Sequence, residues 1–363
     1  MAEVTQQQIE TKLKEYIDPY MDKDLVSTKS VRNIMIEGDQ VVVDVVLGCP
    51  AGGYKDALAA KLKEMVESVA GVAKARVNIN VAIQAHAVQK GVKTISGIKN
   101  IIAVASGKGG VGKSTTATNL ALALSAEGAK VGVLDADIYG PSQPRMLGIH
   151  GKPESKDGQT LEPLVSYHVQ TMSIGFLVDE ETPMIWRGPM VTQALQQLLN
   201  DTNWSDLDYL VIDLPPGTGD VQLTLAQQVP VSGAVIVTTP QDIALLDARK
   251  GLKMFEKVEV PVLGIVENMS IHICSNCGHE EHIFGEGGGQ RMADQYDVDF
   301  LGALPLDIKI REQVDSGRPS VVAEPDGRIA QIYREIARRT AAKLALQSKN
   351  YAAKFPQIVI QNN

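Results

Sequence analysis

One glycine-rich segment has the residue types and spacing of a loop that binds phosphate groups, and it reads Gly107-Lys108-Gly109-Gly110-Val111-Gly112-Lys113-Ser114. Its glycines let backbone N–H groups turn toward anionic oxygens. Lys113 is spaced to reach the β- and γ-phosphates of a nucleotide, and the Ser114 hydroxyl is spaced to ligate Mg²⁺. Together with Thr115, which opens the expected helix, this segment predicts a site for ATP and Mg²⁺.

Two apolar segments run into carboxylates. Residues 209–212 end at Asp213, the usual position of an aspartate that holds Mg²⁺ directly or through water. Residues 131–134 run into Asp135 and Asp137. Either aspartate can cap the next segment or orient the water that attacks the γ-phosphate. We assign the catalytic role to Asp137.

Cysteine is rare in the chain, and two of the three cysteines form a spaced pair. Cys274 and Cys277 can bind one metal ion or one edge of a cluster, but two thiolates do not complete four-coordinate ligation. Either other residues of the chain help, or a second subunit donates its own pair. Two copies related by a two-fold axis supply four thiolates, which suits a bridging 4Fe-4S cluster or a zinc ion. Cys49 is interpreted as a buried small apolar residue.

Nearby histidines keep a zinc site within one chain open as an alternative, because two cysteines and two histidines are a common zinc ligand set. The candidates are His272, His279 and His282. The spacing argues against it, since His279 and His282 lie only two and five residues beyond Cys277. A thioredoxin-like redox role is weaker still, because the pair does not open a helix after a first strand.

Hydrophobic periodicity predicts the elements that position these residues. An apolar run at 101–105 precedes the phosphate loop, and helical spacing follows it over 115–126, with Gly128 as a C-cap. Farther on, short apolar strands alternate with helical patterns. This alternation predicts an α/β domain, a mostly parallel sheet with helices on both faces. Its further strands are expected at 131–134, 209–212, 234–238 and 262–266.

A small α+β domain is expected in front of the P-loop domain. Its expected elements are a helix near 5–17, a strand at 40–47, a helix around 57–69 and a strand at 75–83. A glycine-containing segment with weak periodicity follows and is expected to be a linker. The predicted units are the small domain (1–85), the linker (86–100), the P-loop domain (101–350) and a C-terminal tail (351–363).

Composition narrows the class of protein. The chain has 363 residues, of which 44% are hydrophobic and 21% charged, and no apolar stretch approaches the ~20 residues of a membrane span. The N-terminus has no secretory pattern, so a cytoplasmic location is expected. A net charge of −8 gives no general electrostatic footprint for nucleic acid, which is not expected as a partner.

Lys108 gives the phosphate loop an additional lysine, and the loop resembles the deviant Walker A motif of the family that contains MinD, ParA, the arsenite-pump ATPase and nitrogenase iron protein. In that family the extra lysine reaches the partner's nucleotide. The resemblance implies a homodimeric ATPase in which Lys108 acts in trans during hydrolysis. It also implies that Asp137 belongs to switch I, that Asp213 belongs to switch II and holds Mg²⁺, and that Asn268 contacts the adenine ring.

A longer set of motifs, over about residues 98–345, resembles the Mrp or ApbC type of iron-sulfur cluster carrier. The set comprises Asp137-Ile138-Tyr139-Gly140-Pro141-Ser142, Arg187-Gly188-Pro189, the stretch 213–220, Glu267-Asn268-Met269-Ser270, the cysteine pair and the stretch 284–288. Residues 1–85 resemble the small assembly-type domain that bacterial members often carry in front. The resemblance implies a homodimer that holds a labile 4Fe-4S cluster and passes it to apo-proteins under the control of ATP, in company with the cluster-assembly machinery.

A MinD- or ParA-like positioning switch with a structural zinc site is the alternative. Its support is a basic amphipathic helix at 328–347, a pattern that can lie on an anionic membrane. A helix packed on the sheet explains the same pattern. We interpret it as a core helix, because the chain continues beyond it, and we expect no stable membrane association.

Overall fold

The computed structural model describes residues 4–178, 188–274 and 276–348. Its main feature is an eight-stranded sheet in the order β15-β12-β11-β6-β10-β7-β9-β8, in which every pair is parallel except the edge pair β8 and β9. The strands are β6 (Ile98–Ala105), β7 (Val131–Asp135), β8 (Leu164–Ser166), β9 (Val169–Ser173), β10 (Leu207–Asp213), β11 (Gly233–Thr238), β12 (Val262–Glu267) and β15 (Phe300–Ala303).

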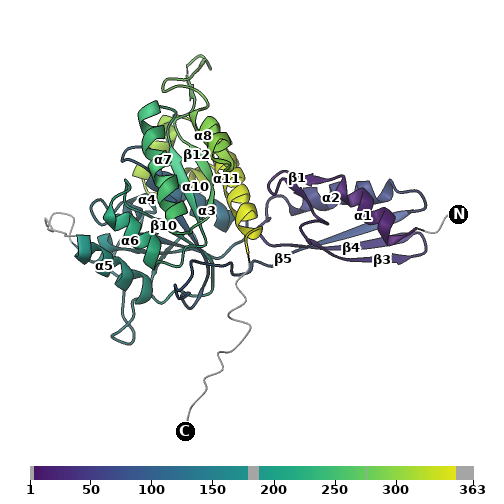
Figure 1. The fold of residues 1–363 in the computed structure, drawn as a ribbon, viewed down its shortest axis with the longest axis horizontal. Helices are drawn as coiled ribbons and strands as arrows, with labels where there is room; N and C mark the ends of the chain where they lie inside the picture. The colour runs from purple at the N-terminus through teal and green to yellow at the C-terminus, as the bar shows by residue number, and fades with distance from the viewer. Residues whose placement is uncertain (1–3, 179–187, 275, 349–363) are drawn as a thin grey trace, which may run out of the picture.

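Helices cover both faces of this sheet, because the central strands are apolar on both sides. On β11, Ile236 packs in one apolar cluster with α7 (Asp242–Lys257) and α8 (Gly288–Tyr296), whereas Val235 and Val237 belong to the larger core on the other face. That larger core includes α3 and α11, which pack against each other (Figure 1). The predicted α/β fold class is therefore confirmed. The remaining helices of this layer structure are α3 (Lys113–Ala126), α4 (Gln143–Met146), α5 (Gly188–Asn200), α6 (Asp220–Gln228), α9 (Ile308–Asp315), α10 (Ser320–Ala323) and α11 (Arg328–Ala345).

A smaller unit precedes the P-loop domain and lies beside it in Figure 1. Its sheet has the order β3-β4-β5, and alternate residues of β4 are fully buried, as expected for a sheet with one covered face. Two helices supply that cover through Ile9 and Leu13 and through Leu58, Leu62 and Val66. The elements are α1 (Gln6–Lys14), β1 (Ile17–Asp18), β2 (Lys23–Asp24), β3 (Val31–Glu37), β4 (Gln40–Leu47), α2 (Lys55–Glu67) and β5 (Lys74–Val81).

Several elements differ from the sequence-based expectation. β6 begins at Ile98, inside the segment 86–100 that we expected to be a linker, and His86 is buried against Asn100 of that strand. β3, β9 and the two edge strands β8 and β15 were not expected, because they are short or interrupted by polar residues. The predicted tail at 351–363 lies outside the described residues.

Helix α11 is a core helix, as we interpreted it. Its apolar stripe, which includes Tyr333, Ile336 and Leu344, is buried, and the helix packs against α3 and β15. Among the residues with described positions, no helix is both long and apolar enough to cross a bilayer.

A buried charge cluster joins the small unit to the P-loop domain, and we call it the interdomain latch. Glu127, the C-cap of α3, has a fully buried side chain that binds Arg334 Nε at 2.8 Å and Arg338 Nη2 at 2.7 Å. From the small unit, the Gly53 N–H donates to Glu127 Oε2 at 2.8 Å, and Tyr20 Oη lies 3.0 Å from Arg338 Nη1. The latch therefore joins the small unit to the C-terminal end of α3, the helix whose N-terminal end follows the phosphate loop.

Glu127→Gln is predicted to destabilise the protein by about 3 kcal/mol at pH 7, because it leaves the buried Arg338 guanidinium and the half-buried Arg334 guanidinium without their carboxylate. Burial opposes ionisation, but hydrogen bonds from Arg338, Gly53 and Arg334 lower the pKa of Glu127 below its ordinary 4.5. The contribution of the carboxylate is thus present above about pH 4.5 and is lost as the pH falls through the lower folded-state value. Urea unfolding of both proteins across pH 3 to 7 measures it.

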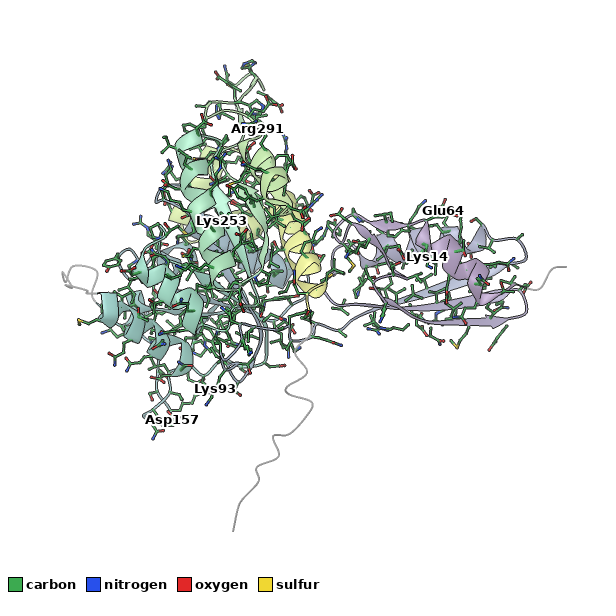
Figure 2. All side chains as sticks on the ribbon, in the orientation of Figure 1. Lys14, Glu64, Lys93, Asp157, Lys253 and Arg291 are labelled. Atoms are coloured by element: carbon green, nitrogen blue, oxygen red, sulfur yellow. The ribbon has the colours of Figure 1, made fainter. Side chains whose placement is uncertain are left out.

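The matched control is Glu64→Gln, at a surface ion pair with Lys61 on the small unit (Figure 2). It should change the free energy of unfolding by less than about 1 kcal/mol. A loss at Glu127 that is equally large at pH 3 and pH 7 would contradict the assignment to the charge.

Candidate functional site

The phosphate loop lies between β6 and α3, at the carboxyl edge of the sheet. Gly110 and Gly112 have φ of 82° and 84°, a backbone conformation that glycine adopts without strain. Gly112 is also the N-cap of α3, so the first N–H groups of this helix open onto the loop. Apart from the glycine itself and its two chain neighbours, no described residue has an atom within 4 Å of where a Cβ on Gly109 or Gly110 would be. The loop therefore fits a polyphosphate.

Lys113 brings the acidic residues of the site together. Its ammonium contacts Asp213 closely, lies 3.9 Å from Asp137 Oδ2, and is 3.1 Å from Ser114 Oγ. Its side chain is only 5% exposed, so these carboxylates balance a charge that is almost out of solvent. The Ser114 hydroxyl and the Asp213 carboxylate are oxygen donors of the kind that Mg²⁺ prefers, and the residues present fit this ion.

The two aspartates after β7 have different surroundings. Asp135 is fully buried and accepts hydrogen bonds from the N–H groups of Asp137, Ser142 and Gln143. Burial and the charge of Asp213 raise the pKa of Asp135 to about 7. Burial also raises the pKa of Asp137, although the Lys113 ammonium opposes the rise. Asp135 thus has the capping geometry, and Asp137 is the aspartate that faces Lys113.

Other residues of the loop are placed as follows. Lys108 is half-buried, and in the described part of the chain its ammonium has no ion-pair partner. Gly107 packs against α7 so closely that a Cβ would lie 2.1 Å from the Asp247 carbonyl carbon. Thr115 is in the first turn of α3, where its carbonyl accepts a hydrogen bond from Asn119.

Asn268 lies directly behind the phosphate loop. Its Nδ2 donates to the Val111 carbonyl at 2.9 Å, and its Oδ1 accepts from the Met269 N–H. A Cβ on Gly112 would be 2.1 Å from the same Nδ2. The amide is thus engaged by the protein backbone, and the adenine contact that the resemblance implied stays a prediction.

The cysteine pair lies on a hairpin that follows β12. The hairpin pairs β13 (His272–Ile273) with β14 (Glu280–Glu281), and its turn is closed by hydrogen bonds from the Cys274 N–H to the His279 carbonyl and from the Gly278 N–H to the Cys274 carbonyl. Cys277 is exposed and Cys274 is half-buried. Hydrogen bonds from the backbone of Cys277 and Asn276 and from the Cys277 side chain lower the pKa of Cys274, which favours the thiolate that metals bind.

The hairpin projects beyond the ends of α7 and α8 (Figure 1). Arg291, at the end of α8 nearest this loop in Figure 2, donates to the Glu286 carbonyl at 2.7 Å. Two of the three histidines considered for zinc bind backbone carbonyls through Nδ1, His272 at Leu306 and His282 at Ser270. Within the described ranges, no three His, Cys, Asp or Glu side chains converge to hold one metal ion.

Sequence reasoning missed Gln143, whose buried side chain reaches Asp213, Ser114 and Thr118 from the start of α4. A glutamine after a loop carries no signal of its own. The predicted motif residue Arg187 lies outside the described residues.

Comparison with known proteins identifies the family. Residues 97–341 match the family described as NUBPL iron-transfer P-loop NTPase, and residues 6–79 match the one described as iron-sulfur cluster assembly protein. The chain belongs to the NUBPL iron-transfer P-loop NTPases. The predicted carrier-type resemblance and the small assembly-type domain are thereby confirmed.

Relatives of this P-loop NTPase have consistent names. It is 60% identical over 278 residues to the iron-sulfur cluster carrier protein of Pseudomonas fragi, covering 76% of this chain and 97% of that protein. It is 49% identical over 347 residues to the protein of the same name from Haemophilus influenzae, covering 94% and 93%. The iron-sulfur cluster transfer protein NUBPL of Mus musculus is 53% identical over 254 residues, or 69% of this chain and 80% of that protein.

Two solved structures share the fold of the P-loop domain. A nucleotide-binding protein from Archaeoglobus fulgidus in complex with ADP is 40% identical, with a TM-score of 0.56 over 63% of this NTPase and 90% of that chain. The cell division ATPase MinD of Pyrococcus furiosus is 23% identical, with a TM-score of 0.50 over 66% of this chain and 97% of that one, and shows the shared fold alone.

Gly112→Ala is predicted to lower the melting temperature by about 5 °C, because an alanine is strained at this φ and its Cβ collides with the Asn268 amide. Differential scanning calorimetry without nucleotide measures the change. Gly109→Ala is the control, since space is open there, and it should leave the melting temperature unchanged. Equal melting temperatures for all three proteins would show that the Gly112 and Asn268 contact is not tight.

Proposed function

We propose that this chain is an ATP-hydrolysing iron-sulfur cluster carrier. Two copies hold a labile 4Fe-4S cluster between their cysteine pairs and pass it to apo-proteins. The observation that carries the proposal is the placement of the cysteine hairpin and the phosphate loop at one edge of the sheet, with Asn268 between them. The names of the relatives support the same cargo.

Polar side chains around the phosphate loop have roles in binding or hydrolysing ATP. The glycine N–H groups and Lys113 hold the phosphates of ATP, and Ser114 and Asp213 hold Mg²⁺, which when bound offsets the phosphate charge. Asp137, beside the Lys113 ammonium, orients the attacking water. Asn268 fixes the back of the loop and borders the base.

Binding of the cluster depends on the number of thiolates that the protein supplies. Cys274 and Cys277 supply two thiolates per chain, and a second copy on a two-fold axis completes the four that a 4Fe-4S cluster takes. The cysteine turn is exposed, which suits a cluster that is transferred to another protein. Zinc at the same four thiolates is the competing occupant.

A second copy fits the exposed apolar surface at the carboxyl edge. Tyr139, Ile243, Leu246 and Ile283 are 62%, 64%, 49% and 50% exposed, and they come from the loop after β7, the start of α7 and the segment after β14. In the proposed dimer these side chains form part of the surface that the second copy covers. In this homodimer Lys108, which has no ion-pair partner among the described residues of its own chain, acts on the nucleotide of the partner.

A short run of contacts supports coupling between nucleotide and cargo. From the Val111 carbonyl the link passes to Asn268, whose N–H donates to the Thr238 carbonyl. Two residues on, the Ser270 carbonyl lies 2.8 Å from His282 Nδ1, at the foot of the hairpin. A shift of the phosphate loop would therefore reach the cysteine turn.

The recipients are apo iron-sulfur proteins, and the cluster-assembly machinery of the cytoplasm is the source. The family match favours this function over a MinD-like positioning switch. Liposome co-sedimentation with and without ATP separates the two, because a membrane switch binds more tightly with ATP, and no such increase is expected here.

Anaerobic reconstitution with iron and sulfide is predicted to give about four irons per dimer with the Mössbauer spectrum of a 4Fe-4S cluster. Cys277→Ala should lose the cluster, whereas Cys49→Ala, which changes a buried cysteine of the small unit, should keep it. Stoichiometric zinc that iron does not displace would make the cysteine pair structural and refute the carrier function.

Lys108→Ala is predicted to lower the ATPase rate roughly 10³-fold while nucleotide affinity stays within about threefold, since the lysine acts on transition-state charge in the partner's site. Lys152→Ala, an exposed lysine, is the control. Mixing Lys108→Ala with Lys113→Ala should restore part of the activity, because each mixed dimer has one complete site. No recovery on mixing would argue that Lys108 acts within its own chain.

A further inference from the structure

Gln143 is buried at the centre of the nucleotide site, and the function proposed above does not use it. We propose that Gln143 is a positioning residue, which orients the Asp213 carboxylate for Mg²⁺ and ties the segment 136–142 to it. This inference rests on the nucleotide half of the proposed function and is independent of the cargo.

Both polar atoms of the Gln143 side chain have hydrogen-bond partners. Its Nε2 donates to Asp213 Oδ2 at 3.0 Å and to the Ser114 carbonyl at 3.2 Å, and its Oε1 lies 2.7 Å from the Thr118 hydroxyl. The side chain is 0% exposed. A flipped amide would place Oε1 against the Asp213 carboxylate, so only one orientation satisfies both ends.

Asp213 is held from two sides as a result. Lys113 takes one carboxylate oxygen and Gln143 takes the other. The charge of Lys113 attracts, but a flexible ammonium does not define the plane of a carboxylate. The planar amide of Gln143 does, and a neutral donor leaves the negative charge of Asp213 available to a cation.

The backbone of the same residue extends this arrangement. The Gln143 N–H donates to Asp135 Oδ2 at 3.0 Å, and Asp135 also accepts from the Asp137 N–H at 3.2 Å. Gln143 thus bonds one carboxylate through its side chain and another through its backbone, at the end of the segment that carries Asp137 and the exposed Tyr139. A movement of that segment changes the position of Asp213.

The test is the Mg²⁺ dependence of binding of a fluorescent ATP analogue to the full-length protein, prepared without iron. In Gln143→Leu, the Mg²⁺ concentration for half-maximal enhancement of binding should rise about tenfold, the effect expected when a residue that orients a metal ligand is lost. Affinity for the analogue in EDTA should stay unchanged. Thr118→Val, which removes the hydroxyl that bonds Oε1 and also the Ser114 carbonyl and the Met146 sulfur but leaves both bonds of Nε2 in place, should give a smaller shift in the same direction.

Gln170→Leu is the matched control, because this glutamine bonds the Ser205 carbonyl away from the site. An unchanged Mg²⁺ midpoint in Gln143→Leu would overturn the proposal, and so would an equal loss of affinity with and without Mg²⁺. If Gln143→Leu does not fold, Gln143→Met keeps the volume of the side chain and decides by the same criteria. Failure of cluster reconstitution would leave this measurement unaffected, so the two proposals fail separately.

Discussion

The charge of Lys113, buried between Asp213 and Asp137, is the constraint on which the site depends. An ammonium in this setting is stable only where carboxylates face it, and this requires the ends of β7 and β10 to meet beside the first turn of α3. The parallel register of β6, β10 and β7 satisfies that requirement. A polyphosphate competes with those carboxylates for the Lys113 ammonium. Nucleotide binding therefore depends on how the acidic residues are arranged around this charge.

The same edge of the sheet carries the cysteine hairpin, because β12 ends beside β11 in the parallel array. Asn268 occupies the first position after the strand, and the hairpin begins only four residues later at His272. A connection this short limits how far the phosphate loop and the cysteine hairpin can move relative to each other. The coupling proposed above would therefore need only small changes of backbone geometry within the P-loop domain.

Much of this was predictable from the sequence, for identifiable reasons. The central strands are continuous apolar runs, and the phosphate loop is specified by local spacing, so both could be predicted. β3 could not, because Arg32 and Asn33 interrupt its apolar pattern, and neither could Gln143 or Glu127. Each of these two polar residues is ordinary in sequence and acquires its role only when helices distant along the chain, α4 on α3 and α11 on α3, bury it against charged partners.

The interdomain latch has a geometric consequence. Helix α3 begins at the phosphate loop and ends at Glu127, so its roughly 20 Å length separates the nucleotide edge of the molecule from the small unit. Two copies that meet through their nucleotide edges would hold their small units at opposite extremities. The surface of the small unit that faces away from the latch would then lie outside the seam between the copies, and a dimer of this kind would leave it accessible.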